Sequence, residues 1–342
     1  MRLSVASRTL DDANCPDVYF TAGYGMADAS TKHGRWEALH YEDRLLLPYV
    51  VTEIGDGHLD AASPYGYAGI HVAPGTTERD LARFWRLAQE QWRDMGLVAM
   101  FFRFSPFEPL VALEGVRTTH LRDTVTVPID GDADALWHGM EGRSRTAVRK
   151  ARRLGYTATV RPAHAADLHS GSPFRTLYEQ TMRRVGSRLE YLFGDGYYTE
   201  LLKGLGPSLL IAEVFSEDGV VCASALILRH RDRVHYHLAG SDPVAARDGV
   251  NNLLLWTVIH WAVRNGARLF HLGGGFRAED SLFKFKRSFG GRRTQFWTGA
   301  LVVDERAYDE LVERRAFMCG QSPSELIGAG YFPAYRVRHE LT

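Results

Sequence analysis

The second half of the chain alternates short apolar runs with polar turns, a pattern typical of a β-meander. The predicted strands are residues 209–215, 220–228 and 234–238, and the turn Ser216-Glu217-Asp218-Gly219 joins the first two. A polar loop follows, after which Asn251 or Asn252 is expected to cap a helix that runs through Val263 and ends near Asn265-Gly266. The next apolar strand begins at Leu269. The predicted order is therefore three strands, a helix and a strand.

The first half repeats this plan less clearly. Strands are predicted at residues 36–41, 45–54, 69–72 and 97–104, with a helix at 77–94 whose start, Thr77 with Asp80, is like a capping box. The segments WRDMGLVAMFFRF and AVRNGARLFHLGG are parallel enough to suggest an internal duplication. The acidic, glycine-containing stretch 129–135 is the predicted linker between two domains.

Candidate chemistry is densest between Gly266 and Gly291. A short apolar strand ends in Gly273, Gly274 and Gly275, where the backbone can approach a ligand closely or take positive φ. The run Ser281-Leu-Phe-Lys-Phe-Lys286 follows, in a chain where five of the 41 basic residues are lysines. A cation kept dry by aromatic rings, here Phe283, Phe285 and Phe289, would stabilise a tetrahedral oxyanion, which makes Lys286 the catalytic candidate. The alternative is an amphipathic strand or helix edge with two solvated lysines.

A basic amphipathic helix is predicted at residues 143–154. Six cations fall within eleven residues, and a narrow apolar stripe made of Ala147, Val148, Ala151 and Leu154 runs between them. Such a helix either binds phosphate groups of RNA or a nucleotide, or presents a solvated face.

Several isolated residues are weaker candidates for substrate binding. Arg103 and Arg183 lie at the ends of apolar segments, where a guanidinium can bind a carboxylate or phosphate, or pair with an internal acid. Tyr65 and Tyr67 flank a turn glycine and serve either recognition or packing. His235 and His237 are expected to share one face of a strand, with Tyr236 on the other and His271 close by. Without a third ligand of suitable spacing, no metal site is predicted.

Composition narrows the class of protein. The 342 residues suggest two domains, and acids and bases are equal at 41 each, so any polyanion must be bound by a local patch. Three widely separated cysteines favour a reducing compartment. Because the chain shows neither a signal-peptide pattern nor an apolar run long enough to span a bilayer, we expect a cytoplasmic protein without membrane insertion.

Six segments, taken in order, resemble the FemABX family of aminoacyl-transferases. They are PYGYAG at 64–69, FFRFSP at 101–106, RSRTAVRKARRLG at 143–155, TMRRVGS at 181–187, HYHLAGSDP at 235–243, and the block 273–291. The resemblance implies an α/β (α+β) fold of two tandem GNAT-like domains, each a mixed, mostly antiparallel sheet flanked by helices. It implies a first domain at 1–137, with 317–342 packing back on it, and a second at 138–316 that carries the catalytic motifs.

The resemblance also implies a reaction. An amino acid would move from aminoacyl-tRNA to an amine acceptor, either a peptidoglycan precursor or a small natural product or peptide, without cofactor or metal. The lysine of the family's Phe-Lys motif maps onto Lys286, and Tyr65 and Tyr67 fall in the acceptor groove. The residues expected to bind substrate are Tyr65, Tyr67, Arg103, Arg183, Tyr236, Gly273, Gly274, Gly275, Lys284 and Phe285. Those expected to bind tRNA or phosphate are Arg145, Arg149, Lys150, Arg153, Asn251 and Asn252.

Two other functions remain open at this point. GNAT enzymes that use acyl-CoA generally carry Q/R-x-x-G-x-G/A before the central helix, and the aligned stretch 246–251 lacks its first and last features. Asp248 adds a charge that repels phosphate, which argues against acyl-CoA as the donor. The second alternative is a binding module that kept the fold and lost turnover.

Overall fold

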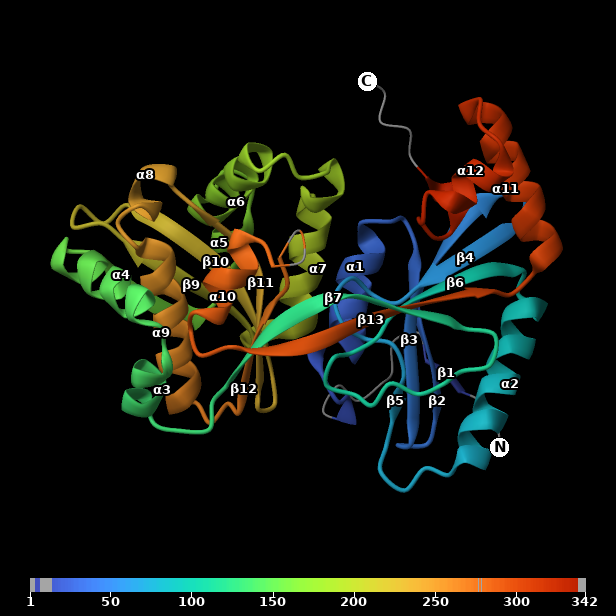
Figure 1. Ribbon diagram of the computed structural model, residues 1–342, viewed down its shortest axis with the longest axis horizontal. Helices are drawn as coiled ribbons and strands as arrows, with labels where there is room; N and C mark the ends of the chain where they lie inside the picture. Colours follow the sequence, from blue (N-terminus) through green and yellow to red (C-terminus); the bar gives the residue numbers. More distant parts are fainter. Residues whose placement is uncertain (1–3, 7–13, 276, 278, 338–342) are drawn as a thin grey trace. The chain divides into compact units, whose positions relative to one another are not determined.

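The computed structural model describes residues 4–6, 14–275, 277 and 279–337, and it contains two compact units (Figure 1). Unit 1 consists of residues 1–121 and 296–342, and unit 2 of residues 122–295. These limits fall within two long strands, whereas the sequence analysis places domain boundaries after residues 137 and 316. The division into functional domains stays a prediction.

Unit 1 is a mostly antiparallel sheet with helices packed against it. Its elements are β1 (Ser4–Ala6), η2 (Val18–Phe20), α1 (Ala22–Ser30), β2 (Arg35–Tyr41), β3 (Leu45–Gly55), β4 (His58–Ala62), β5 (His71–Val72), α2 (Glu78–Asp94), β6 (Leu97–Arg103), most of β13 (Arg292–Val302), α11 (Glu305–Cys319), α12 (Pro323–Gly328) and η5 (Ala334–Arg336). The strand order is β1-β2-β3-β4-β6-β13, with β5 paired to β3. All pairs are antiparallel except β4 with β6.

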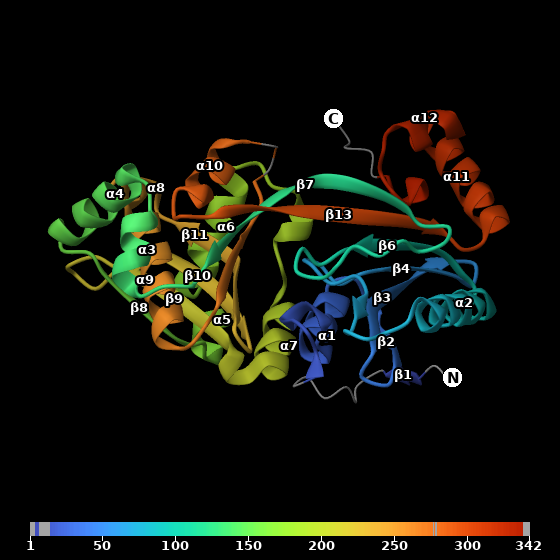
Figure 2. The same ribbon diagram turned by 60° about the horizontal axis from the view of Figure 1, so that its bottom comes forward.

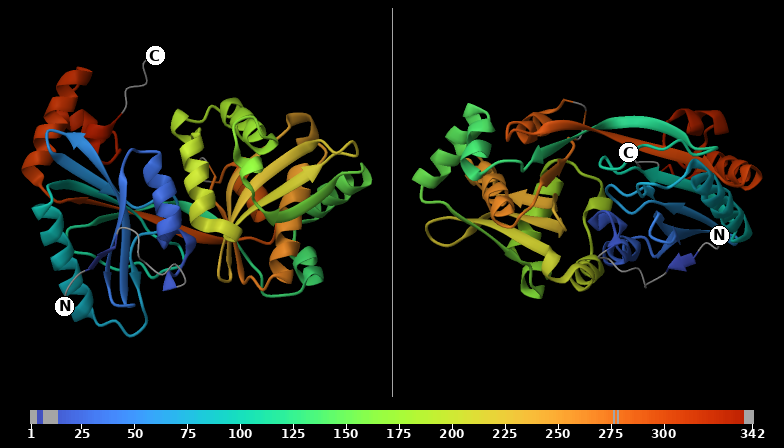
Figure 3. Two further views of the ribbon diagram at one scale, coloured as in Figure 1. Left: turned by 180° about the vertical axis from the view of Figure 1, so that it is seen from behind. Right: turned by 90° about the horizontal axis from the view of Figure 1, so that it is seen from below.

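Residues of β6 contribute to two hydrophobic cores, and the alternation of sides is interrupted at Val98, where the pairing with β4 shifts by one residue. Leu97, Met100 and Phe102 belong to the core that includes Phe84 and Trp92 of α2. Val98 and Ala99 belong to a second core with Tyr308 and Leu311 of α11. Figure 3 shows α11 and α12 beside β4 and β6. The C-terminal segment is held there by Arg336, whose Nη2 donates to Asp60 Oδ1 at 2.6 Å.

Unit 2 has the strand order β7-β12-β11-β10-β9-β8. Its elements are most of β7 (Arg117–Pro128), α3 (Ala133–Gly139), α4 (Gly142–Arg153), β8 (Thr157–Pro162), α5 (Ala165–Leu168), α6 (Pro173–Arg184), η3 (Leu189–Tyr191), α7 (Asp195–Leu205), η4 (Gly206–Ser208), β9 (Leu209–Phe215), β10 (Val221–His230), β11 (Arg233–Ser241), α8 (Pro243–Ala246), α9 (Val250–Arg264), β12 (Leu269–Gly273) and α10 (Ser281–Arg287). Helices α4 and α9 cover one face of this sheet, and α6 and α7 the other (Figures 1 and 2). The predicted α/β class, with mostly antiparallel sheets flanked by helices, is confirmed.

The predicted meander and the strand after the helix are present as β9, β10, β11 and β12. The predicted cap of α9 is wrong. Gly249 is the N-cap with φ 93°, and Asn251 and Asn252 lie inside the first turn. A Cβ on Gly249 would come within 2.5 Å of the Ala147 carbonyl oxygen, so the close approach of α4 and the left-handed backbone both require glycine there.

Several strands were missed. β4, β7, β8 and β13 have no counterpart among the predicted elements, and the strand predicted at 69–72 is reduced to His71–Val72. The predicted linker at 129–135 includes the first turn of α3, which begins at Ala133. Asp132 caps this helix by accepting a hydrogen bond from the Ala135 backbone N–H, which explains why an acidic stretch is helical here.

Candidate acyl-transfer site in unit 2

The site is built where two parallel strands separate. β11 and β12 pair in register from Arg233 with Leu269 to His235 with His271, and no pair follows in the described residues. On its other side, β12 pairs with β7 from Leu269 to Gly273. The register of this pairing shifts between His271 and Gly273. Tyr236, the next residue of β11, and Gly274, three residues after His271, therefore lie at the opening between the strands.

Lys286 reaches both sides of this opening. Its Nζ donates to the Gly274 carbonyl oxygen at 2.7 Å and lies 5.9 Å from the centre of the Tyr236 ring. The residue is 7% exposed, although it carries a charge. Burial lowers the pKa of Lys286 to about 8, and the nearby Asp280 carboxylate opposes this shift. The side chain is therefore mostly an ammonium at pH 7, in a site that excludes most water.

The two lysines of the predicted motif have different environments because they lie on a helix. Residues two apart on a helix point about 200° apart, which follows from 3.6 residues per turn. Lys286 is buried with Phe283, while Lys284 is exposed. Phe285 is half-buried and its ring meets Phe289 edge-on at 5.4 Å. Asp280 caps α10 by accepting from the Phe283 backbone N–H at 2.7 Å.

Asp280 was missed by the sequence analysis, although an acid just before an apolar helical run is a recognised start signal. The triple glycine makes room for this acid. A Cβ on Gly275 would lie 2.1 Å from Asp280 Oδ1, and Gly273 has φ 67°. The Gly275 carbonyl oxygen also accepts from Arg122 Nη1 at 2.9 Å. The glycines thus let the chain pack closely around the end of β12, which fixes the carbonyl that holds Lys286.

The basic helix α4 is joined to α10 by hydrogen bonds, one of which is buried. Ser144 Oγ and Ser288 Oγ are 2.6 Å apart, and both residues are almost fully buried. The Glu141 backbone N–H donates to the Ser288 carbonyl oxygen at 2.8 Å. Ser288 caps the C-terminus of α10, two residues after Lys286. The position of Lys286 therefore depends on the N-terminus of α4.

The four cations of α4 that were predicted to bind tRNA or phosphate divide into two sets. Arg145 and Lys150 bind protein groups: Arg145 Nη1 donates to the His138 carbonyl oxygen at 2.9 Å, and Lys150 Nζ lies 2.9 Å from Asp248 Oδ1. Arg149 and Arg153 are exposed, and Arg149 lies over the Trp137 ring at 5.3 Å. Arg149 and Arg153 are thus the two predicted phosphate ligands on this helix that face solvent.

The loop before α9 is held by polar contacts at the end of β11. Asn251 Nδ2 donates to Ser241 Oγ at 3.0 Å, and Arg184 Nη2 donates to the Ser241 carbonyl oxygen at 3.3 Å. Asn252 is half-buried within the helix. Arg183, the predicted ligand next to Arg184, is exposed and pairs with Glu179 at 3.5 Å.

The histidines of β11 have separate partners. His235 and His271 are buried, with their Nδ1 atoms 3.4 Å apart, as the predicted proximity of His271 requires. The pairing of β11 with β10 shifts by one residue between Tyr236 and Leu238, which places a bulge at His237. His237 Nε2 lies 2.5 Å from Tyr197 Oη on α7. Burial lowers the pKa of His237 to about 3, and His235 adds to this effect, so this imidazole stays neutral. Burial raises the pKa of the Tyr236 phenol.

The remaining candidates belong to unit 1. Tyr67 packs edge-on against Phe296 at 4.9 Å, and the Tyr65 carbonyl oxygen accepts from Tyr24 Oη at 2.6 Å. Arg103 Nη1 donates to the Ser63 carbonyl oxygen at 3.1 Å, and the guanidinium lies 4.9 Å from the Phe101 ring centre. The roles of Tyr65, Tyr67 and Arg103 in substrate binding stay predictions.

No group of three or more potential metal ligands occurs among the described residues. Within the same part of the chain, no helix is long and apolar enough to cross a bilayer.

Comparison with known proteins agrees with this geometry. Residues 141–287 match the family described as "Acetyltransferase (GNAT) domain". A search of curated proteins finds no match. The fold is similar to the crystal structure of FemX, with a TM-score of 0.69 and 14% identity over 90% of this chain and 99% of FemX.

Two further structures have lower similarity. The C-terminal domain of a putative lysylphosphatidylglycerol synthetase from Agrobacterium fabrum gives a TM-score of 0.54 and 15% identity, over 85% of this chain and 91% of that domain. L-PGS from Bacillus licheniformis gives a TM-score of 0.53 and 15% identity, over 82% of this chain and 87% of that chain. At these identities the similarity concerns the fold alone. The predicted resemblance to Fem-like proteins is confirmed at that level. The chain has the fold of FemX, with a GNAT-type domain that includes α4, α9 and Lys286.

Proposed function

We propose that the chain is an acyltransferase that forms an amide between an aminoacyl group carried by tRNA and an amine acceptor. The observation that carries this proposal is the position of Lys286. It is a buried ammonium at the opening between β11 and β12, anchored by one hydrogen bond to the Gly274 carbonyl oxygen.

The chemistry follows from the remaining donors of that ammonium. A lysine has three N–H groups, and among the described residues Gly274 accepts from one of them. When the acceptor amine attacks the acyl carbon, the carbonyl oxygen becomes an oxyanion, which the other two N–H groups can stabilise. The intermediate then collapses: the C–N bond remains, the C–O bond to the ribose breaks, and the ribose oxygen takes the proton that the amine loses. In a dry site this charge stabilisation is much stronger than in water.

The proposal for the donor rests on the Fem-like fold together with the exposed Arg149 and Arg153. The acceptor class follows the same reasoning and is a peptidoglycan precursor or a small natural product or peptide with a free amine. We place the reaction in the cytoplasm, where charged tRNA is made, and without a metal or cofactor.

An N-acyltransferase that uses acyl-CoA is the second candidate, because one argument against it loses force in the structure. The charge of Asp248 is neutralised by Lys150 at 2.9 Å, and its Oδ2 also accepts from Tyr156 Oη at 3.3 Å. Its repulsion of a phosphate is therefore much smaller than the sequence implies. The match of residues 141–287 to a family described as an acetyltransferase domain favours the same donor.

Ribonuclease separates the two donors. A reconstituted reaction contains a mixture of charged tRNAs, a small-molecule extract that supplies the amine, and the purified protein, and the product is followed by mass spectrometry. We expect amide formation that stops when ribonuclease is added. Product that survives ribonuclease and increases with added acyl-CoA would assign the second function, and RNA binding without any product would assign a binding module.

A further inference from the structure

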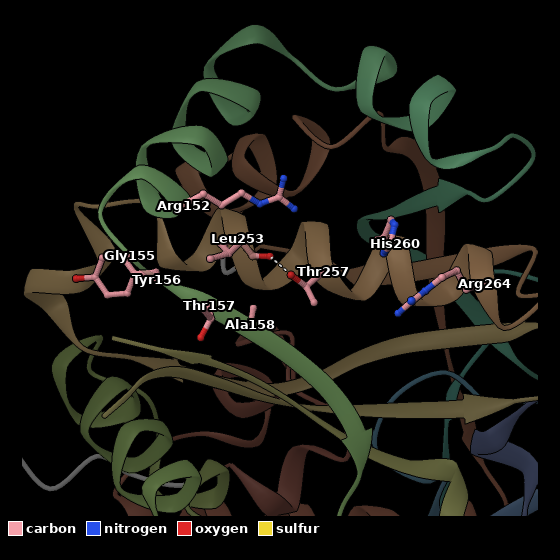
Figure 4. Close-up of a pocket in the computed structure, with 9 residues that line it drawn as sticks. All are labelled: Arg152, Gly155, Tyr156, Thr157, Ala158, Leu253, Thr257, His260 and Arg264. Carbon is pink, nitrogen blue, oxygen red and sulfur yellow. Dashed lines mark hydrogen bonds between the residues drawn. The ribbon is translucent and has the colours of Figure 1, made fainter. Parts of the chain in front are cut away.

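A second polar site of unit 2 lies beside β8, the last strand in the order, whereas Lys286 lies at β11 and β12. It is a hollow of about 510 Å³ between the end of α4, the start of β8 and the outer surface of α9. Its lining residues, drawn in Figure 4, are Arg152, Gly155, Tyr156, Thr157, Ala158, Leu253, Thr257, His260 and Arg264. Strands β9 and β10 separate β8 from the β11–β12 opening, so this hollow is a separate place from the proposed acyl-transfer site.

The side chains of α9 that line the hollow form one stripe of the helix. Leu253, Thr257, His260 and Arg264 are spaced by four, three and four residues, which puts them on the same face. Figure 4 shows the Arg264 side chain extending back along α9 toward Thr257, and Arg152 extending from α4 over the middle of α9. Two guanidinium groups thus enter the hollow from opposite ends.

Within the described chain neither Arg152 nor Arg264 forms an ion pair, while Lys150, two residues before Arg152, is paired with Asp248. One carboxylate, that of Glu217, packs beside Gly155 at the rim. Two like charges pointed into one hollow repel each other, and a bound anion removes that repulsion.

We propose that this hollow binds a phosphate group. Two arginines supply paired N–H donors that match phosphate oxygens, and His260 adds a polar group between them. The Thr257 hydroxyl is already bound, since it donates to the Leu253 carbonyl oxygen at 2.8 Å. The volume is in the range of small-molecule sites, about 300 to 1,000 Å³, which is enough for a nucleoside monophosphate whose base would lie against Tyr156. Because the exposed Arg153 directly follows Arg152, an RNA backbone phosphate could supply the same chemistry. The proposal does not depend on the acyl-transfer reaction.

The test compares the full-length protein with Arg152→Gln/Arg264→Gln. Both side chains lie at the surface and form no ion pair in the described chain, so the fold is expected to survive, which circular dichroism checks. The control is Arg188→Gln/Arg306→Gln, which removes the same charge from two exposed positions that do not line the hollow, and Arg306 also loses its ion pair with Glu310 at 3.0 Å. The probes are inorganic phosphate, AMP, adenosine as the uncharged control, and a 12-nucleotide RNA, each titrated by calorimetry.

We expect AMP and inorganic phosphate to bind wild type and the control, and adenosine to bind neither. Affinity for AMP should fall at least tenfold in the hollow variant, because a hydrogen bond to a charged group is lost at each arginine. If AMP does not bind but RNA does, the phosphate comes from RNA. The hollow variant must then also lower the slope of log affinity against log salt by about 1.4, the value for two contacts to a single strand. Equal binding of every probe by the hollow variant and the control overturns the proposal, as does the absence of binding by wild type.

Discussion

Replacing Lys286 by Met should stabilise the protein at neutral pH while removing its activity. Met has a similar length and fills the same space between Phe283 and Tyr236 without a charge. Lys286 is 7% exposed. Its pKa falls from 10.5 to about 8, a difference of about 2.5, which corresponds to about 3 kcal/mol of unfavourable burial at about 1.4 kcal/mol for each pKa unit.

Part of this stabilisation is lost because the Met side chain cannot donate the hydrogen bond to the Gly274 carbonyl oxygen. A carbonyl left without its donor destabilises by about 1 kcal/mol, so we expect a net stabilisation of about 2 kcal/mol at pH 7. For a unit of 150 to 250 residues each kcal/mol raises Tm by about 2 to 4 °C, which gives roughly 4 to 8 °C.

The pH dependence distinguishes this explanation from a general packing effect. Below pH 8 Lys286 is protonated in both the folded and the unfolded protein, and the burial penalty is fully present. Between about 8 and 10.5 the folded state releases the proton first, the unfolded state binds more protons, and wild-type stability rises with pH. The advantage of the Met variant should therefore shrink over this window.

Urea unfolding at pH 7 and pH 10 measures both effects. Lys284→Met is the matched control, since it removes an exposed lysine two residues away on the same helix. It should change stability by less than about 0.5 kcal/mol at either pH. If the advantage of Lys286→Met is absent at pH 7, or is the same at both pH values, the assignment of a buried charge at this position is refuted.

Four further outcomes are expected. Lys286→Ala should lower kcat by about 10² to 10³ with the fold intact, as removal of one oxyanion donor does, and a folded variant with a normal rate would exclude Lys286 from the mechanism. In wild type, kcat should fall as pH rises through about 8, because the ammonium form is the one that stabilises the oxyanion; a rate that instead rises over this window would indicate a neutral lysine acting as a base. Ser288→Ala should destabilise the protein by about 1 to 3 kcal/mol, because Ser144 keeps a buried, unpaired hydroxyl. The double variant with Ser144→Ala should lose less stability than the sum of the two single changes, and a double-mutant cycle in urea measures this difference. Arg149→Gln/Arg153→Gln should lower the salt slope of tRNA binding, measured by filter binding, by about 1.4 if both contact phosphates, while an unchanged slope would make α4 a solvated face.

The sequence predicts the central elements of unit 2 well because they carry strong local signals. The meander consists of apolar runs separated by a turn, and the helix after it has a clear stop at Asn265-Gly266. Its start was mispredicted because the cap is decided by α4, which approaches too closely for any side chain at position 249. Local capping preference favours Asn251 or Asn252, and a contact made from about 100 residues away outweighs it.

The long strands β7 and β13 were missed for a related reason. β7 begins with the exposed run Arg117–Leu121, and both strands carry threonines and arginines where an ordinary strand would show apolar alternation. Their stability comes from neighbours that are distant in sequence, such as Thr124 Oγ1 with the Thr294 carbonyl oxygen at 3.1 Å. A pattern of single residues cannot contain that information.

The candidate site shows the same division between local and distant signals. Lys286 stands out in the sequence because a lysine between phenylalanines follows three glycines. On the helix, Lys286 is buried and Lys284 is exposed, which the spacing of two residues explains. The groups that give it its properties come from elsewhere: Gly274 anchors the amine, Tyr236 covers it, and Ser144 holds the end of its helix. Since Ser144 lies on the same helix as Arg149 and Arg153, any force that displaces α4 when a polyanion binds must act on the end of α10. The proposed binding at the basic helix and the position of the Lys286 ammonium are thus mechanically linked, and the loss of Ser144 and Ser288 should weaken that link before it affects either site alone.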